Sequence, residues 1–335
     1  MQAGQEYKPI ADVFAQYRGV RVVVLGASGF VGRWVSRLLC HCGAEISLPV
    51  RDPRTAEAIF ARYDIEGDVI EADLGRDPGV LESVFRRARP AVTFNLAGYG
   101  IDRSERDEAT AYSVNEALVM KLCHAAARYR ERAWSRQAVV HVGSALEYGE
   151  ISNDLREDSD PCPTTLYGRS KLAGTRALVD CCDRLDVNGI TARLFTVYGP
   201  GEHAGRLLPA LMETARTGQA LKLTDGRQKR DFTYVEDVAE GLLRLGLGCE
   251  PGGKAVNLAT GSLLTVRQFV ETAADVLSIP PERLQFGEIP TRVEEMSHLP
   301  VSVERLRRTT GWVPGTHVSE GIRRTAEFYS EQTEE

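Results

Sequence analysis

Tyr167 and Lys171 have the types and the spacing that suit proton transfer, because they stand four residues apart in the run Tyr-Gly-Arg-Ser-Lys. Residues four apart lie on one face of an α-helix, so both functional groups would face the same way. A phenol has a pKa near 10, and a neighbouring ammonium stabilises the phenolate, which lowers that pKa. The pair therefore predicts a tuned phenol that exchanges a proton with a carbonyl or alkoxide oxygen. With 11 tyrosines in 335 residues, about 0.2 such pairs are expected by chance, so the spacing alone is only suggestive.

A third candidate is Ser144, which follows the apolar run Ala138–Val142 directly after Gly143. That run has the length and composition of a buried strand, and ligands of open α/β sheets bind at the carboxyl ends of the strands. Taken alone, a serine at this place is more often a turn residue than a catalyst. Together with Tyr167 and Lys171 it forms a group that can bind and protonate a carbonyl oxygen, so we expect these three residues to be catalytic.

A glycine-rich turn, Gly26-Ala27-Ser28-Gly29-Phe30-Val31-Gly32, follows the β-branched run at 20–25 and precedes a helical pattern that reaches Leu39. Glycines there let the backbone approach a pyrophosphate, and the start of the helix supplies unpaired N–H groups and a positive dipole end. The glycine spacing by itself also fits a merely tight turn, but the strand before it and the helix after it are the context that the motif demands. We expect a dinucleotide cofactor to bind at Gly26, Ser28, Gly29, Phe30, Val31 and Gly32.

The end of the second apolar run, Val50-Arg51-Asp52-Pro53-Arg54, bears on the choice between the two nicotinamide dinucleotides. NAD sites of this type place an acid here to bind the ribose 2′-hydroxyl, and Val50 cannot accept that bond. Arg51, together with Arg54, can pair with a 2′-phosphate through parallel hydrogen bonds, which favours NADP(H) over NAD(H). Two alternatives stay open: Asp52 binds the ribose, or both arginines are simply solvated.

The elements that must position these residues alternate between strands and helices. Further along the chain the rhythm changes after Gly199-Pro200-Gly201 to helices, short strands and proline-containing loops, with a capping box at Thr265–Gln268 that opens a late helix. The alternation predicts an α/β fold with a doubly wound parallel sheet of the Rossmann type. The apolar runs that would form its strands are 20–25, 46–50, 69–70, 92–96, 139–142 and 190–194.

The change of rhythm near residue 200 predicts two domains. Residues 1–199 are expected to form an NADP(H)-binding Rossmann domain, and whether segments of about 231–260 return to it stays open. Residues 200–335 are expected to form a smaller α+β domain that binds the substrate. The first twenty residues are either an additional helix or a loose tail.

Composition and charge argue against several other classes of protein. The net charge is −6 with basic residues scattered along the chain, so we expect no nucleic-acid partner. The start of the chain lacks the apolar core of a secretory signal, and no window reaches the ~18 apolar residues of a membrane span, so we expect a cytoplasmic protein without membrane contact. The seven cysteines, which include Cys40-His41-Cys42 and Cys181-Cys182, do not match the spacing of metal or redox pairs. They are predicted to be buried free thiols, and no metal site is expected.

Taken together, these features resemble the extended short-chain dehydrogenase/reductase family, and the similarity runs from Val20 to about Pro314. Downstream, Arg230-Asp231-Phe232-Thr233-Tyr234-Val235 and Arg292 are similar to the motifs of the sugar-nucleotide branch, in which two arginines grip a diphosphate. The alternative for either arginine is a surface salt bridge. The other matching motifs are the glycine-rich turn, Ala72-Asp73-Leu74, Asn95-Leu96-Ala97-Gly98, Ser144, the Tyr167/Lys171 pair and Arg193-Leu-Phe-Thr-Val-Tyr-Gly-Pro-Gly201.

The resemblance implies further binding residues and an assembly. It implies a homodimer formed through a helix bundle that uses the segments around 105–128 and 163–185. For the cofactor the implied residues are Asp73, Leu74, Leu96, Ala97, Gly98, Asn115, Phe195 and Val197, beside Tyr167 and Lys171. For a nucleotide-diphosphate sugar they are Ser144, Leu146, Tyr167, Thr196, Arg206, Leu207, Arg230 and Arg292.

Departures from the family patterns narrow the implied reaction. Ala145 and Leu146 stand where the dehydratases of the family carry an Asp-Glu pair, so dehydration is not expected. Val50 replaces an acid of the epimerases, and Ala117-Leu118 replaces their Gly-Thr pair, which weakens simple 4-epimerisation. The tail, with Phe286–Pro290, Arg292, Glu295-Met296 and Gly311–Pro314, resembles the 4-ketoreductases of deoxysugar pathways, such as CDP-abequose synthase.

The sequence thus predicts an NADP-dependent oxidoreductase that transfers hydride to the C4 keto group of a nucleotide-linked 4-keto-6-deoxyhexose. Tyr167 would donate the proton, Ser144 would polarise the carbonyl, and Lys171 would hold the nicotinamide ribose. The alternative is a nucleotide-sugar 4-epimerase with tightly bound NAD, and a lesser alternative is a non-catalytic dinucleotide-binding sensor. The nucleotide base and the C4 configuration of the product are not predicted.

Overall fold

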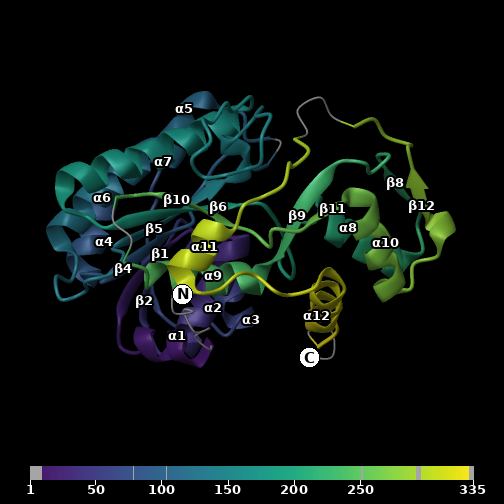
Figure 1. The fold of residues 1–335 in the computed structure, drawn as a ribbon. Helices are drawn as coiled ribbons and strands as arrows, with labels where there is room; N and C mark the ends of the chain where they lie inside the picture. Colours follow the sequence, from purple (N-terminus) through teal and green to yellow (C-terminus); the bar gives the residue numbers. More distant parts are fainter. Residues whose placement is uncertain (1–9, 78, 103, 250–251, 292–295, 332–335) are drawn as a thin grey trace, which may run out of the picture.

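The computed structural model describes residues 10–77, 79–102, 104–249, 252–291 and 296–331 (Figure 1). Its centre is a parallel sheet of seven strands in the order β10-β6-β5-β4-β1-β2-β3. The order runs outward in two directions from β1 and β4, so the sheet is doubly wound and all carboxyl ends lie along one edge. The strands are β1 (Arg21–Leu25), β2 (Glu45–Val50), β3 (Asp68–Glu71), β4 (Val92–Asn95), β5 (Val139–Ser144), β6 (Gly189–Leu194) and β10 (Ala255–Leu258).

The residues of β1 show why the sheet is buried on both faces. Val22 and Val24 belong to the core on one side, and Val23 and Leu25 belong to the core on the other. Successive side chains of a strand point to opposite faces, so a continuous run of apolar residues needs cover on both. Helices supply that cover.

Helices lie on both faces of the sheet (Figure 1). On one face α2 packs against α9 with α1 beside them, and on the other face α4, α6 and α7 form the second core. Short helical turns connect the carboxyl edge to these helices. The elements of this part are α1 (Ile10–Tyr17), α2 (Phe30–His41), α3 (Pro53–Arg62), α4 (Val80–Ala88), α5 (Glu108–Tyr112), the π-helical turn η1 (Ser113–Ala117), α6 (Leu118–Tyr129), the 3-10 turn η2 (Ala145–Glu147), α7 (Leu166–Leu185) and α9 (Val235–Gly246).

A smaller lobe is built on a three-stranded sheet in the order β11-β9-β7. The rings of Phe232 and Phe269 stack at 4.2 Å within the same core that fills the α2 side of the large sheet, so the two lobes share one apolar interior. A short parallel pair, β12 with β8, lies at the far end of this lobe (Figure 1). Its elements are β7 (Thr196–Tyr198), α8 (Leu207–Thr217), β8 (Leu221–Leu223), β9 (Lys229–Tyr234), β11 (Leu263–Thr265), α10 (Val266–Leu277), η3 (Pro281–Arg283), β12 (Leu284–Phe286), α11 (Glu304–Thr310) and α12 (Val318–Glu331).

The chain crosses between the lobes more than once. After β9 it returns to the large sheet through α9 and β10, and β10 pairs with β6. α11 packs on β10 and α9, whereas α12 packs on α10 and β9. The division into 1–199 and 200–335 stays a prediction, and the structure places α11 as well as the segment 235–258 on the side of the large sheet.

Every strand predicted for the first 199 residues is present, with its ends within about two residues of the prediction. The helix alternative is correct for residues 10–17, whose Tyr17 is buried and donates its hydroxyl to the carbonyl of Leu243 at 2.8 Å. The predicted capping box opens α10, where Thr265 and Gln268 accept each other's backbone N–H groups at 3.1 and 2.8 Å.

All seven cysteines are free thiols, and Cys42, Cys123 and Cys181 are buried. The prediction of burial is wrong for Cys162 and Cys249, which are exposed because they lie in connecting segments and not on an element that faces a core. None of the described helices is long and apolar enough to cross a lipid bilayer.

Candidate active site

Ser144 and Tyr167 come together at the carboxyl edge of the large sheet. Ser144 is the last residue of β5, Tyr167 lies in the first turn of α7, and the serine hydroxyl is close enough to the phenol to lower its pKa. The Oγ atom of Ser144 also accepts the N–H of Leu146 at 3.2 Å, which starts η2 immediately after the strand. Thr165 fixes the start of α7 by accepting the N–H of Gly168 at 3.0 Å. The end of a strand and the start of a helix thus hold an alcohol beside a phenol.

Two glycines let α7 lie against the turns at this edge. A β-carbon on Gly168 would overlap the carbonyl oxygen of Leu146, and one on Gly174 would overlap the carbonyl oxygen of Asn115. Only a residue without a side chain permits such an approach. The approach brings Tyr167 within reach of Ser144.

Asn115 was expected to contact the cofactor, but its amide is engaged inside the protein. Its Nδ2 donates to the carbonyl of Tyr99 and to Oγ of Ser170, each at 2.8 Å, and its Oδ1 accepts the N–H of Tyr99 at 3.1 Å. The residue is fully buried in η1, a π-helical turn of the kind that often marks a functional site. Through these hydrogen bonds Asn115 connects the loop after β4 to α7. The geometry does not support a direct hydrogen bond from its side-chain amide to the cofactor.

Burial controls the ionisation of both Tyr167 and Lys171. Burial lowers the pKa of Lys171 to about 8, and the Glu147 carboxylate opposes this fall. Burial raises the pKa of Tyr167 above its ordinary value and Glu147 raises it further, whereas Arg206 and the Ser144 hydroxyl lower it. The expectation of a lowered phenol pKa is therefore wrong, because the loss of hydration raises the pKa of Tyr167 by more than the nearby Arg206 cation lowers it. A phenol that stays protonated at neutral pH suits a proton donor.

The glycine-rich turn has the close packing that a dinucleotide site requires. Gly26 adopts a φ of +79°, and a β-carbon on it would lie 2.8 Å from the N atom of Ala97, in the loop after β4. Gly29 caps α2 and donates its N–H to the carbonyl of Gly26 at 3.0 Å, and a β-carbon on Gly32 would overlap that same carbonyl oxygen. The turn leaves the partly exposed Ser28, and Phe30 and Val31 in the first turn of α2, at the carboxyl edge. The backbone of the turn therefore packs as closely as the glycines allow, and its binding of a cofactor stays a prediction.

The acid and the two arginines after β2 have different environments. The carboxylate of Asp52 caps α3 by accepting the N–H of Arg54 at 3.1 Å and the hydroxyl of Thr55 at 2.6 Å. Arg51 and Arg54 are exposed, and neither side chain pairs with any residue that the structure describes. The alternative in which Asp52 binds the ribose loses support, because its carboxylate already holds the helix start.

The loops after β3 and β4 border the glycine-rich turn. Asp73 accepts the N–H groups of Gly75 and Arg76 at 3.0 and 3.1 Å, which shapes the loop that also carries Leu74. Leu96-Ala97-Gly98 follow β4, and the first two of these residues lie against Gly26. The structure thus gathers these expected cofactor residues at one edge of the sheet.

The expected binding residues that come directly after β6 lie where the large sheet meets the small lobe. Phe195 makes an edge-to-face contact with His298 at 5.3 Å, and Thr196 and Val197 begin β7. Thr196 pairs in register with Phe232 of β9, the strand that carries Arg230. The small lobe is therefore joined directly to the last strand of the predicted cofactor half.

The arginines expected to bind substrate differ in position. Arg206 caps α8, ahead of Leu207, and is close enough to Tyr167 to lower the pKa of its phenol. Arg230 lies near His298 in the small lobe and has a partner of its own. Arg292 lies outside the described residues.

Glu147 and His298 are among the buried titratable residues that sequence reasoning missed. Glu147 is fully buried and pairs with Arg193 at 2.9 Å. His298 accepts the N–H of Asp231 at 3.0 Å, and burial together with Arg230 lowers its imidazole pKa to about 3. The sequence did contain a signal for the Glu147–Arg193 pair. Opposite charges inside apolar runs are seldom buried unless they pair with each other.

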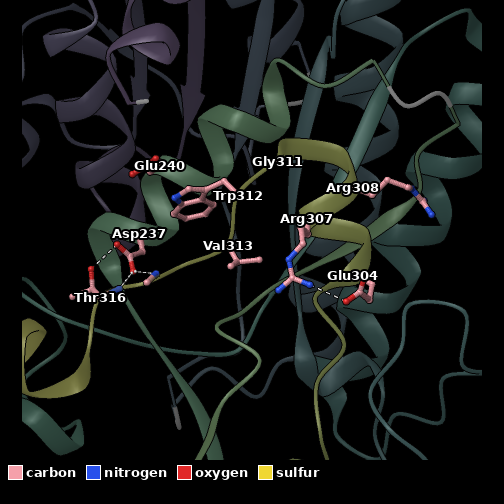
Figure 2. Close-up of a pocket in the computed structure, with 10 residues that line it drawn as sticks. Asp237, Glu240, Glu304, Arg307, Arg308, Gly311, Trp312, Val313 and Thr316 are labelled. Carbon is pink, nitrogen blue, oxygen red and sulfur yellow. Dashed lines mark hydrogen bonds and ion pairs between the residues drawn. The ribbon is translucent and has the colours of Figure 1, made fainter. Parts of the chain in front are cut away.

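A cavity of about 880 Å³ lies elsewhere, between α9, α11 and the segment 311–316 (Figure 2). Asp237 there accepts the N–H and the hydroxyl of Thr316 at 2.8 and 2.7 Å, and Glu304 pairs with Arg307 at 2.8 Å. The cavity contains none of the residues with predicted catalytic or binding roles. The candidate active site is the one at Ser144 and Tyr167, because a site is defined by the chemistry of its groups and not by volume.

The family model described as "NAD dependent epimerase/dehydratase family" matches residues 22–259. The chain is 29% identical over 315 residues to dTDP-6-deoxy-L-talose 4-dehydrogenase (NAD(P)(+)) of Kitasatospora kifunensis, which covers 90% of this chain and 93% of that protein. It is 28% identical over 330 residues to UDP-glucose 4-epimerase of Mycolicibacterium smegmatis, covering 94% of this chain and 100% of the relative.

A solved structure of MoeE5 in complex with UDP-glucuronic acid and NAD is similar to the whole molecule. The TM-score is 0.78 at 25% identity, and the match covers 93% of this chain and 99% of the other. The Rossmann fold of the chain is therefore shared over nearly its full length.

Lys171→Met should stabilise the folded protein at neutral pH. The pKa of Lys171 is about 8 in the fold against an ordinary 10.5, so the unfolded chain binds this proton more tightly. The cost of burying the ammonium is complete below pH 8 and disappears as the pH rises to 10.5. We expect the free energy of unfolding to rise by about 1 to 3 kcal/mol at neutral pH. Urea denaturation at neutral and at alkaline pH measures this gain and its disappearance.

Lys222→Met is the matched control, since Lys222 is an exposed lysine on β8. It should change stability little at either pH. Destabilisation by Lys171→Met at neutral pH, or an equal gain in stability from the control, would contradict the inference that burying the Lys171 ammonium costs stability.

Proposed function

The chain belongs to the NAD dependent epimerase/dehydratase family, and from that premise we propose that it is an NADP(H)-dependent 4-ketoreductase of sugar nucleotides. Its substrate is a nucleotide-linked 4-keto-6-deoxyhexose, whose C4 carbonyl becomes a hydroxyl. Both relatives named above carry out chemistry at C4 of a nucleotide sugar by name, one as a 4-dehydrogenase and one as a 4-epimerase. A 4-dehydrogenase run in reverse is a 4-keto reductase, which supports this choice.

The observation that carries the proposal is the approach of Tyr167 to Ser144, close enough for the serine hydroxyl to lower the pKa of the phenol, with Lys171 one turn further along α7. The cradle at Gly26 and Gly32, which a β-carbon would fill, fits the pyrophosphate of a dinucleotide. A bound nicotinamide supplies the hydride.

The chain's own groups handle the charge that develops on the carbonyl oxygen. Ser144 donates a hydrogen bond to that oxygen, and Tyr167 donates its phenolic proton to it as negative charge builds up. Lys171 binds the nicotinamide ribose and, as a cation, compensates the phenolate that Tyr167 becomes. Each interaction is strongest when charge has formed, which is the condition for accelerating the step.

The substrate's diphosphate would be held by arginines of the second predicted domain. Arg206 is close enough to Tyr167 to lower the pKa of its phenol, and Arg230 and Arg292 are the family-implied pair. Guanidinium groups bind phosphates through paired hydrogen bonds and so anchor one end of the substrate. This assigns the sugar nucleotide to residues 200–335 and the cofactor to residues 1–199 with the returning segment, in a chain that we expect to dimerise.

A nucleotide-sugar 4-epimerase is the second candidate. The epimerase relative is almost as similar as the dehydrogenase, and the MoeE5 structure holds NAD. The same three residues would then work in both directions with a cofactor that never leaves. Val50 at the ribose position favours the reductase, and so does Arg51, whose side chain pairs with no described residue, because they suit a 2′-phosphate and not a 2′-hydroxyl.

Cofactor stoichiometry separates the two candidates. With a dTDP- or UDP-linked 4-keto-6-deoxyhexose, we expect one NADPH to be oxidised for each product, followed by absorbance at 340 nm and product analysis. Full conversion sustained by a trace of bound NAD would establish the epimerase instead. No turnover across a panel of nucleotide sugars would favour the dinucleotide-binding sensor.

Tyr167→Phe should bind NADPH as the wild type does and lose most of its turnover. The variant lacks the proton donor but keeps the ring that packs beneath Gly100. Loss of a general acid lowers kcat by about 10²- to 10⁴-fold. Steady-state kinetics and a fluorescence titration with NADPH measure the two properties, and an unchanged kcat would remove Tyr167 from the chemistry.

Arg51→Gln should weaken the binding of NADPH and leave the binding of NADH unchanged. A charge-assisted hydrogen bond to the 2′-phosphate contributes roughly 1.5 to 3 kcal/mol, so we expect the Kd of NADPH to rise about tenfold or more. Arg227→Gln, a well exposed arginine of the small lobe, is the control. Equal effects on both coenzymes would mean that Arg51 does not read the 2′ position.

A further inference from the structure

Glu147 is a carboxylate with no exposed surface, three residues after Ser144 at the end of η2. Its Oε1 accepts the backbone N–H of Ser144 at 2.8 Å. Its Oε2 accepts the hydroxyl of Thr175 and the Nε–H of Arg193, each at 2.9 Å. One side chain therefore joins the end of β5, the middle of α7 and β6.

Arg193 is the cation that allows this burial. It is 4% exposed and its guanidinium lies 4.5 Å from the centre of the Tyr148 ring. A buried ion pair is by itself weak support for stability, because the cost of removing both ions from water offsets their attraction. A role beyond packing must therefore come from the other groups that the charge of Glu147 faces.

Those groups are the proposed catalytic residues on α7. The carboxylate raises the pKa of Lys171 against the effect of burial, and it also raises the pKa of Tyr167. The other titratable groups around the pair are His141 on β5, whose imidazole pKa is held well below its usual range, and Arg206 and Glu105, which act on Tyr167. His141 is thus neutral at neutral pH and adds no second positive charge beside Lys171.

We propose that Glu147 is a positioning residue of the reaction, which fixes Ser144 relative to the catalytic helix and supplies the negative charge that keeps the buried Lys171 a cation. This inference rests on the proposed function, in which a cationic Lys171 compensates the phenolate of Tyr167. Without the carboxylate, Lys171 loses its proton at a lower pH and the phenolate forms without its counter-charge.

Glu147→Gln tests the charge while keeping the shape. In the wild type, kcat for reduction falls as the pH rises through about 8, where Lys171 loses its proton. In the variant the fall begins at lower pH, so kcat near pH 8 is lower by about fivefold for a pKa displaced by one unit and by about fiftyfold for two units, with a smaller deficit near pH 6.5. A folded variant with the wild-type pH profile overturns the proposal, because a purely structural role lowers kcat without moving the profile.

Glu240→Gln is the matched control. The partly buried Glu240 pairs with the buried Arg244 at 2.6 Å on α9, away from α7. It should lower the melting temperature and leave the pH profile of kcat in place. A profile displaced equally by both variants would assign the effect to general loosening and count against Glu147.

A double variant covers the case in which Glu147→Gln alone does not fold. Glu147→Gln with Arg193→Met removes both members of the pair, so no unpaired guanidinium is left buried, and such replacements are often neutral for stability. The double variant should show the same displaced profile. A wild-type profile in it overturns the proposal.

A direct titration of Lys171 separates this inference from the proposed function. The chain has six lysines, so NMR of protein with ¹³C-labelled lysine resolves them, and Lys171→Met assigns the signal that titrates near pH 8. That signal should titrate at lower pH in Glu147→Gln. A shifted titration without any turnover of nucleotide sugars would defeat the proposed function and leave the charge coupling standing, whereas an unshifted titration defeats the coupling even if turnover is normal.

Discussion

The close approach of α7 to the carboxyl edge of the sheet is the constraint on which the site depends. Gly168 and Gly174 carry no side chains where a β-carbon would overlap backbone carbonyl oxygens of η2 and η1. The approach excludes water from the space beneath the helix, so Lys171 is dehydrated and Glu147 is sealed beside Arg193. The same packing brings the phenol of Tyr167 to Ser144. The geometry and the electrostatics of the site therefore have one origin. The packing that aligns the groups also removes water, which strengthens the electrostatic interactions between them.

Much of the fold was predictable because its strands are local patterns. The runs that became β1 to β6 are apolar on both faces and are bounded by turns, so their type and order could be read directly. β10 was harder, since Ala255–Leu258 is only four residues long and its partner β6 ends some sixty residues earlier. The position of α11 was harder still, because contacts between distant segments leave no periodic trace in the sequence.

The site was predictable to the extent that its chemistry is written in motifs. The glycine-rich turn was expected to form a cradle, and the backbone around Gly26 has that form. The direction of the Tyr167 pKa was predicted wrongly, since burial is a property of the packed molecule and not of the Tyr-Lys spacing. The roles of Asn115 and Glu147 depend on hydrogen bonds to residues on other elements. Those partners are distant in sequence and could not be identified from it.

The late arrival of β10 bears on how the chain is made. During synthesis, β6 emerges from the ribosome long before Ala255–Leu258, and the nascent small-lobe segment lies between them. Until then β6 is an outer strand whose free edge offers unpaired N–H and C=O groups to any other strand. A pairing of such high sequence separation also forms slowly, which prolongs this interval. The growing chain thus depends on its own downstream residues, or on a chaperone, to guard that edge, and a fragment that stops at residue 199 would keep it permanently open.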